Sequence, residues 1–367
     1  MNANNAKESS IKNSTNINLR RVKSKLILKI IFENLANHKK YKIIQYNKTI
    51  QNRLDLNLID FYLKNLSPIE IEIQPHKYKR VKFINIPNGN ERYFRIYLDN
   101  YEDKEKYFFY LCENHGINKI KIIISYQIIS FRKLFEDCFY IQKIDFKKFN
   151  RTNIINMKDM FFGCSFLEEL NISNFKTDNV TDMSNMFFGC SSLKEINLSD
   201  FNTNKVEDMS NMFQCCDRLT KLNLSNFNTH NVRKMRCLFC RCSKLKELNL
   251  LNFITHNVTD MCQMFSGCSK LKKIDLSNFN TDNVISMDSM FSKCTSLEEL
   301  NISNFNTNNV VNMKYMFNEC AALNDLNISN FKISNKVEMK HMFRGCPDEL
   351  KEKIKRQNKN IKEEAFR

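Results

Sequence analysis

Apolar and polar residues follow one repeating pattern from Leu134 to the C-terminal part of the chain. The pattern has a period of 26 residues without insertion or deletion, and one cysteine marks each period. Counting each unit from the residue four before its cysteine, it reads M-F-x-x-C-x-x-L-x-x-L-N-L-S-N-F-x-T-x-N-V-x-x-M-x-x. Apolar residues occupy positions 1, 2, 8, 11, 13, 16, 21 and 24, most clearly in the unit that starts at Met186. A fixed period of this length indicates a repeat architecture. The position-5 cysteines are Cys138, Cys164, Cys190, Cys216, Cys242, Cys268, Cys294, Cys320 and Cys346.

Each unit predicts two elements. Positions 8 to 13 read Leu-x-x-Leu-Asn-Leu and end in strict alternation, which favours a short strand with position 12 facing outward. From position 21 through 24 and 2 to 5, apolar residues recur every three or four residues, which favours a short helix or helical turn. Thr at position 18 or Asn at position 20 is expected to cap it. One unit cannot bury its apolar face alone, so the sequence predicts an α/β solenoid, a leucine-rich-repeat-like stack of about nine 26-residue coils.

The repeated sequence Met-Phe-x-x-Cys-x-x-Leu-x-x-Leu-Asn-Leu-Ser resembles the BspA-like leucine-rich repeats, in the variety common in mycoplasma surface lipoproteins and in large protist gene families. The resemblance covers Leu134 to Cys346. It implies a leucine-rich-repeat solenoid and, for some bacterial members, a surface role in adhesion. The chain departs from those members because no signal peptide or lipid-acceptor cysteine is visible near Met1.

Ordinary leucine-rich repeats also place Asn three residues after the last Leu of the strand, whereas this chain has Phe there. The phenylalanines concerned are Phe175, Phe201, Phe227 and Phe253. We therefore expect the Asn, Thr and Cys ladders to satisfy the backbone groups of that turn.

The pattern divides the chain into four parts. Residues 1–20 are basic and expected to be disordered, and residues 21–115 predict a small mixed α+β module. Residues 116–346 are expected to hold the repeats with an N-terminal capping coil, and residues 347–367 a charged C-terminal helix or tail.

Two helices and three strands are expected in the mixed module. Helical spacing covers Leu26–Leu35 and Tyr41–Leu54, and the strands are predicted at Ile69–Ile73, Val81–Ile86 and Tyr93–Leu98. The helical pair is loosely similar to an F-box, a module that docks onto a ubiquitin-ligase scaffold, although it lacks the Leu-Pro start of that family.

Charge is concentrated before the repeats. Residues 1–133 hold 25 Lys+Arg and 12 Asp+Glu, a difference of +13 out of the formal net charge of +17. This excess favours an acidic partner or an anionic surface, but it equally suits a solvated, lysine-coated module. We do not expect nucleic acid as the partner.

No motif for catalysis is present. The chain lacks H-E-x-x-H, G-x-x-x-x-G-K-[ST], G-x-G-x-x-G and G-x-S-x-G, so we predict a protein that is not an enzyme and needs no cofactor. Gly163, Gly189, Gly267 and Gly345 share position 4 and read as turn residues.

The periodic cysteines are interpreted as buried core thiols, because cysteine packs as a small apolar residue. Four further cysteines, Cys215, Cys237, Cys240 and Cys262, cluster in neighbouring units near His230 and His256. Cys237-x-x-Cys240 has a zinc-like spacing, but no second such pair accompanies it. Drift in a cysteine-tolerant repeat is the simpler interpretation, and no metal is predicted.

The outward strand positions 10, 12 and 14 predict a binding strip on a concave face. Its residues are Glu169, Asn171, Ser173, Glu195, Asn197, Ser199, Lys221, Asn223, Ser225, Glu247, Asn249, Lys273, Asp275, Glu299 and Asn301. An alternative is that the Asn and Ser ladders hydrogen-bond one another and mainly stabilise the stack.

These features predict a monomeric protein-binding scaffold, with a protein partner of unknown identity. No apolar run reaches the roughly 20 residues that a membrane span needs, and the expected location is the cytoplasm. A cell-surface adhesin that arrives by a non-classical route and an F-box-like substrate adaptor remain alternative hypotheses.

Overall fold

The chain forms two compact units, Met1–Ser67 and Pro68–Arg367. The boundary between them falls inside the predicted 21–115 module. The computed structural model describes residues 19, 22–35, 40, 43, 46–55, 68–76, 81–99, 110–111, 116–125, 128–149 and 151–367. The predicted disorder of residues 1–20 falls outside these residues, apart from Leu19.

The first unit contains helices α2 (Lys25–Glu33) and α4 (Lys48–Arg53) among its described residues. The side chain of Ser24 caps α2 by accepting the N–H of Ile27 at 3.4 Å. Leu28 and Phe32, four residues apart, are buried, and Phe32 packs with Leu35, Ile43 and Leu54. The first helix predicted from the sequence is therefore present, whereas much of the second predicted helix lies outside the described residues.

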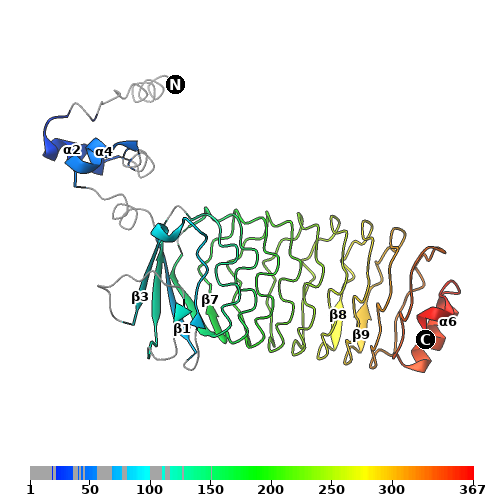
Figure 1. The fold of residues 1–367 in the computed structure, drawn as a ribbon. Helices are drawn as coiled ribbons and strands as arrows, with labels where there is room; N and C mark the ends of the chain where they lie inside the picture. Colours follow the sequence, from blue (N-terminus) through cyan, green and yellow to red (C-terminus); the bar gives the residue numbers. More distant parts are fainter. Residues whose placement is uncertain are drawn as a thin grey trace, which may run out of the picture. The chain divides into compact units, whose positions relative to one another are not determined.

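The second unit starts with a mixed five-stranded sheet (Figure 1). Its strands lie in the order β3 (Phe94–Leu98), β5 (Ile120–Ile124), β1 (Ile69–Pro75), β6 (Ile141–Lys148) and β7 (Glu169–Asn171). Alternating isoleucines of β1 and β5 are buried, which is the period that one packed sheet face requires. The pairs up to β6 are antiparallel, and β6 pairs with β7 in parallel.

Smaller elements complete the second unit. Strand β2 (Val81–Lys82) pairs with β4 (Tyr110–Leu111), and β8 (Lys273–Asp275) pairs in parallel with β9 (Glu299–Asn301). The 3-10 helices are η2 (Glu91–Tyr93) and η3 (Glu363–Ala365), and α6 (Asp348–Gln357) follows the repeats.

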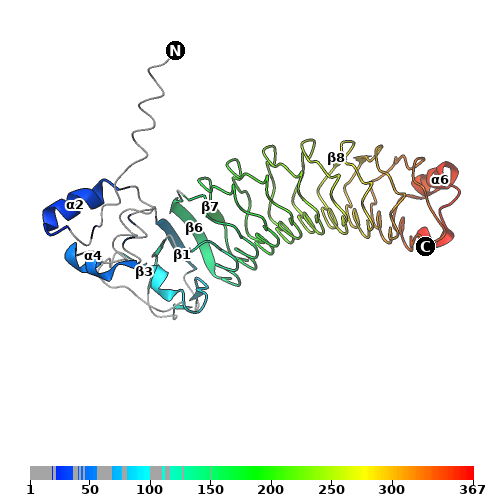
Figure 2. The ribbon, with the colours of Figure 1, turned by 90° about the horizontal axis from the view of Figure 1, so that it is seen from above.

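Equivalent positions of successive repeats lie side by side from β7 to α6 (Figure 2). Parallel bridges connect position 23 of each unit to position 23 of the next, in steps of 26 residues from Ser130 to Glu338. The phenylalanines at position 2 stack in one column from Phe135 to Phe343, with ring centroids 5.4 to 5.9 Å apart. The Met, Leu, Val and Cys side chains of the pattern are buried beside this column.

The fold class predicted from the sequence, an α/β solenoid of about nine leucine-rich-repeat-like coils, is wrong. The described residues contain three α-helices, α2, α4 and α6, and all of them lie outside the repeats. The structure is mostly sheet-like, with a mixed five-stranded sheet, and the chain does not close into helix-backed coils.

Backbone conformation explains why the predicted helical segment is absent. Positions 26 and 4 of every unit have positive φ, for example 56° at Asn185 and 71° at Gly189. Two left-handed residues four positions apart interrupt a right-handed helix. The segment instead forms consecutive turns, such as Met186 N–H to Met183 C=O at 3.2 Å, and the apolar spacing mimics a helical face.

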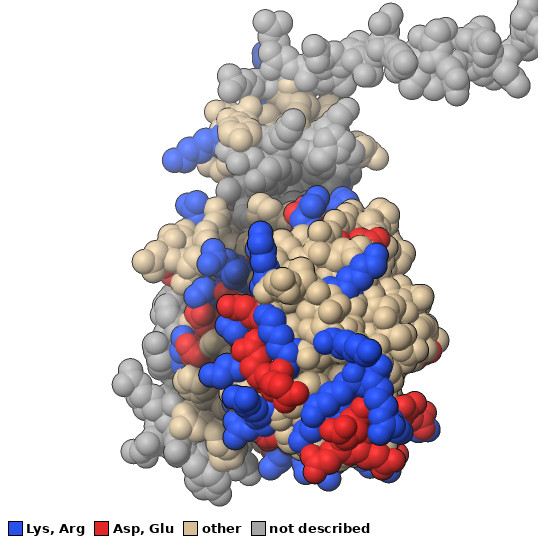
Figure 3. Space-filling model, turned by 90° about the vertical axis from the view of Figure 1, so that its right-hand side faces the viewer, with Lys and Arg blue, Asp and Glu red and all other residues tan. Residues whose placement is uncertain are grey.

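The C-terminal segment covers the last repeat. Phe366 extends the phenylalanine column beyond Phe343, and the N–H of Phe343 donates to the carbonyl of Ala365 at 2.7 Å. Leu350 and Ile354 bury one face of α6. Lys, Arg, Asp and Glu side chains are interspersed over this end of the unit (Figure 3). The helix is thus packed as a charged cap, which disfavours pairing of the last repeat with another chain.

None of the described helices has the length and apolar character needed to cross a membrane.

Candidate functional site

The strip residues predicted from the sequence lie on the surface of the repeats. We call positions 10, 12 and 14 of the units from Glu169 to Asn301 the polar strip. Positions 11 and 13 point into the core or are half-buried, so the alternation exposes positions 10 and 12. The exposed members are Glu169, Asn171, Glu195, Asn197, Ser199, Lys221, Asn223, Ser225, Glu247, Asn249, Leu251, Lys273, Asp275, Glu299 and Asn301, while Ser173 and Ser277 are half-buried.

Position 12 of the polar strip has a local structural task. Its side-chain oxygen accepts the backbone N–H of position 14 in the same unit, at 3.0 Å in Asn197 and 3.1 Å in Asn223. Asp275 accepts the N–H of Ser277 at 2.9 Å, and this hydrogen bond lowers the pKa of its carboxyl group. Because Asn and Asp form such turns readily, they fill position 12 of every unit in the polar strip.

The Asn side chains of the strip therefore bond mainly to their own units. Contacts between units include the amide of Asn171 with the carboxylate of Asp145 at 2.8 Å and Asn301 with Asp275. Side chains of neighbouring units therefore hydrogen-bond each other at these two places, as the alternative interpretation of the ladders expects. Position 12 is structural, which leaves position 10 to vary.

Position 10 carries charges of both signs. Lysines stand at Lys143, Lys221 and Lys273, and glutamates stand at Glu169, Glu195, Glu247 and Glu299. Lys143 pairs with Glu169, and Lys273 pairs with Glu299, where β6 meets β7 and β8 meets β9. Exposed ion pairs of this kind contribute little stability, so these side chains can exchange partners at low cost.

A groove lies at the N-terminal end of the polar strip, where it meets the five-stranded sheet. The hollow measures about 560 Å³, and a neighbouring hollow of about 300 Å³ shares Lys143 and Asp145 with it. We call the larger hollow the strip groove. Its polar lining consists of Lys143, Asp145, Glu168, Glu169, Asn171, Glu195 and Asn197. Four carboxylates against one lysine make this lining acidic.

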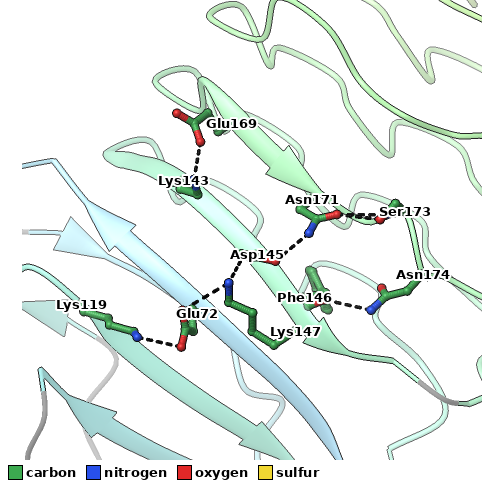
Figure 4. A network of polar contacts seen from close by, with 10 residues as sticks. All are labelled: Glu72, Lys119, Lys143, Asp145, Phe146, Lys147, Glu169, Asn171, Ser173 and Asn174. Atoms are coloured by element: carbon green, nitrogen blue, oxygen red, sulfur yellow. Dashed lines mark hydrogen bonds and ion pairs between the residues drawn. The ribbon is translucent and has the colours of Figure 1, made fainter.

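Ion pairs hold the wall of the strip groove in place (Figure 4). Glu72 on β1 contacts Lys119 at 2.7 Å and Lys147 at 3.7 Å, and Lys147 also pairs with Asp145. Asp145 is only 8% exposed, so the pair and the amide of Asn171 fix its carboxylate. The arrangement presents fixed oxygen acceptors and amides, which suits hydrogen bonding to a polar or basic surface.

The position-5 cysteines lie inside the repeats. All nine are buried, and from Cys164 to Cys346 each thiol donates to the carbonyl of the position-2 residue in the preceding unit, at 3.1 to 3.3 Å. Burial raises the pKa of these thiols, to about 12 for Cys268 and about 11 for Cys346. They act as neutral hydrogen-bond donors of the core.

Asn and Thr ladders complete the turn after the strip. The hydroxyl of Thr203 donates to the carbonyl of Asn228 at 2.9 Å and accepts its N–H at 2.8 Å. The amide of Asn226 donates to the carbonyl of Phe201 at 2.7 Å. The expectation is confirmed for Asn and Thr, whereas the Cys thiols donate to position-2 carbonyls outside this turn.

A match to a known protein family covers the repeats. A family model described as Mycoplasma protein of unknown function, DUF285, matches residues 129–248 and 234–357, which is more than half of the chain. The chain belongs to this family. No curated protein and no solved structure shows significant similarity to it.

In this DUF285 protein, the two histidines contact each other, and the extra cysteines contact one another through their backbone. His230 and His256 are neighbours, as their shared position predicts, with ring centroids 4.7 Å apart. Within the described part of the chain, no group of three or more His, Cys, Asp or Glu residues is placed to hold a metal ion. Cys237 and Cys240 lie in one turn.

Sequence reasoning missed part of the strip groove. Lys143 and Asp145 occupy positions 10 and 12 of the first unit, and the period alone would have placed them on the polar strip of this DUF285 protein. They were not included in the predicted strip, because the unit that starts at Leu134 matches the repeat pattern less closely than the later units. Glu72 and Lys119 carried no comparable signal, because β1 pairs with the distant strand β6 and brings Glu72 to it, and Lys119 contacts Glu72 from the position before β5.

Proposed function

We propose that the chain is a non-enzymatic protein-binding scaffold whose partner lies along the polar strip. The single observation behind the proposal is a row of exposed, variable charges at position 10, mounted on turns that position 12 fixes. Such a surface is rigid before binding, so little conformational entropy is lost when a partner docks.

The strip groove favours a partner with basic or amide groups. Its lining carries Asp145, Glu168, Glu169 and Glu195, and the carboxylate of Asp145 is held before any partner arrives. Opposite charge gives specificity and a faster association rate more than affinity. We therefore infer that binding weakens as salt rises.

Charge reversal on the full chain tests the proposal. Cross-linking in native cells identifies the proteins captured by the wild-type chain and by a Glu169→Lys, Glu195→Lys variant. The matched control is Glu207→Lys, an exposed glutamate at position 22, outside the polar strip. Partners lost from the first variant and kept by the control support the strip. Equal capture by both variants refutes it, as does turnover of a substrate that a point mutation abolishes.

A cytoplasmic location and a monomeric state belong to this proposal. Cell fractionation tests the first, and the mass measured by light scattering tests the second. A stable dimer whose formation covers the polar strip would contradict the scaffold as stated.

A cell-surface adhesin of the BspA-like type is the second candidate. It is supported by the resemblance of the repeated sequence from Leu134 to Cys346, and the polar strip would serve as its adhesive surface. Trypsin treatment of intact cells tests it. Loss of the protein from intact cells supports the adhesin, whereas full protection in intact cells with digestion after lysis refutes it.

A substrate adaptor is the third candidate, and α2 favours it. Leu26, Ile27 and Ile30 are 68%, 53% and 51% exposed, which is unusual for apolar residues of one short helix. We infer that this face contacts a ligase scaffold. Leu26→Glu with Ile30→Glu in the full chain should remove ligase association, and Lys29→Glu on the same helix should leave it. Association kept by the double variant refutes the adaptor.

A further inference from the structure

Cys237 and Cys240 form a close pair in one repeat turn, where both are nearly fully buried. The N–H of Cys240 donates to the carbonyl of Cys237 at 3.1 Å, which closes a turn over the two residues, and the thiol of Cys237 donates to the side-chain oxygen of Gln263 in the next unit at 3.6 Å. The ends of such a turn lie within about 7 Å between Cα atoms. A disulfide spans about 4.4 to 6.8 Å between Cα atoms, so the turn already has the required reach.

Neighbouring units hold the backbone of the pair on both sides. The N–H of Cys237 donates to the carbonyl of Cys262 at 2.8 Å, and the carbonyl of Cys240 accepts the N–H of Cys215 at 2.8 Å. The two thiols therefore stay together without a rearrangement of the stack. Cys237 and Cys240 keep 5% and 4% exposure, whereas Cys216 and Cys242 of the core have none.

The electrostatic surroundings activate one thiol of the pair. The neighbouring Cys240 thiol and the adjacent Arg236 guanidinium lower the pKa of Cys237, against the effect of burial. The neighbouring Cys237 thiol and burial raise the pKa of Cys240. Cys237 is thus the nucleophile, because the thiolate is the reactive form.

We propose that Cys237 and Cys240 are an oxidisable dithiol, which hydroperoxides convert into an intrachain disulfide. The Cys237 thiolate attacks one peroxide oxygen, the O–O bond breaks, and Cys237 becomes a sulfenic acid while hydroxide leaves and takes up a proton. The sulfur of Cys240 then attacks the sulfenic sulfur, and water leaves. Two thiols and one hydrogen peroxide give one disulfide and two waters; both sulfurs are oxidised and both peroxide oxygens are reduced.

The core cysteines Cys216 and Cys242 differ from Cys237 and Cys240 in burial, in hydrogen bonding and in the pKa of Cys237. Their thiols are fully buried, each donates to a backbone carbonyl, and burial raises their pKa values. They remain reduced under the oxidant concentration that converts the pair.

Tryptic digestion isolates the pair, because Arg236 and Arg241 flank it and cleavage gives the peptide 237–241. The folded, full-length chain is treated with hydrogen peroxide, its remaining thiols are alkylated, and the non-reduced digest is weighed. We expect the peptide to lose two hydrogen atoms and escape alkylation. Conversion should precede modification of the Cys216 and Cys242 thiols, because both are fully buried.

Serine variants separate the pair from its neighbours. Serine stands at the equivalent positions of later units, as in Ser289, Ser266 and Ser292, so Cys→Ser changes suit these turns. Cys240→Ser should abolish the disulfide and leave a sulfenic acid on Cys237 that a 1,3-dione traps, whereas Cys262→Ser should leave the disulfide unchanged. A pair that stays reduced while the core thiols react, or a disulfide to Cys215 or Cys262 instead, overturns the proposal.

Discussion

The two sides of each repeat solve the problem of stacking in different ways. On the turn side, the backbone N–H groups of positions 26, 2 and 4 donate to carbonyls of the next unit, as Asn211 does to Arg236 at 2.8 Å and Phe213 to Leu238 at 3.0 Å. On the strip side, backbone pairing between units forms β6–β7 and β8–β9. In the units between them, the side chain of position 12 occupies the N–H of position 14 in its own unit, as in Asn197 and Asn223.

This difference determines which residues are free to vary. Because the turn side is joined by the backbone, its surface position 26 is Asn211, Cys237, Gln263, Ser289 or Tyr315 in successive units. On the strip side the position-12 side chain bonds within its own unit, so this position keeps Asn or Asp, while position 10 varies between Lys and Glu. We therefore expect the charges at position 10 to determine which partner the strip recognises. On the turn side, the proposed thiol oxidation depends on two cysteines, Cys237 and Cys240, that occupy variable positions of one turn.

The largest effect is expected in the core that both sides share. Phe213 stacks between Phe187 and Phe239, with ring centroids 5.6 and 5.9 Å away. Phe213→Ala should lower the free energy of unfolding by about 3–5 kcal/mol, because it leaves a cavity in the column. Leu251→Ala, at an exposed strip position, is the control and should change it by less than about 0.5 kcal/mol. Urea titration measures both; similar values would show that the column is not a continuous core.

The corner between the two sides is the next most sensitive place. Thr229 donates to the carbonyl of Ile254 at 2.9 Å and accepts its N–H at 2.8 Å. Thr229→Val keeps the shape and leaves both backbone groups unsatisfied, so the free energy of unfolding should fall by about 1–3 kcal/mol. Thr220→Val, exposed on the surface, should have little effect in the same titration. An unchanged stability for Thr229→Val would contradict the role of the Thr ladder.

Alkaline pH should weaken the core selectively. The ordinary thiol pKa is 9.0, and burial raises the pKa of Cys268 to about 12. Above pH 9 the unfolded chain therefore binds fewer protons than the folded chain, so this stability is complete below pH 9 and is lost as pH rises toward the folded pKa. Each such thiol contributes a slope of about 1.4 kcal/mol per pH unit.

A variant that lacks one thiol makes this measurable. Cys268→Ala should have a shallower loss of stability between pH 9 and 10.5 than the wild-type chain, by about one such slope. The measurement is chemical denaturation at each pH. Identical slopes would mean that the buried thiols do not titrate on unfolding.

The smallest effect separates the structural and variable positions of the strip. Asn223→Ala removes the acceptor for the N–H of Ser225 and should lower the free energy of unfolding by about 0.5–1.5 kcal/mol. Lys221→Ala, at position 10 of the same unit, should change it by less than about 0.5 kcal/mol. A larger loss for Lys221→Ala would reverse the assignment of the two positions.

The period, the buried set and the exposed strip were predictable, because they depend on the alternation and spacing of residue types. The helical return was not, because apolar residues three or four apart fit a series of turns as well as a helix. Positive φ at positions 26 and 4 distinguishes the turns from a helix. A glycine in the sequence indicates positive φ at Gly189, but the residues Cys215 and Cys237 give no such indication. The strip groove also depends on β1, whose partner in β6 follows about 70 residues later in the sequence.

Backbone amide hydrogen exchange, resolved by residue, tests the difference between the two sides most directly. Strong protection is predicted for the amides of Asn211, Phe213 and Cys215, which donate to the next unit, and fast exchange for Lys221 and Asn223 on the strip. Equal protection on both sides, or protection in the four-residue pattern of a helix across residues 206–216, would contradict the account.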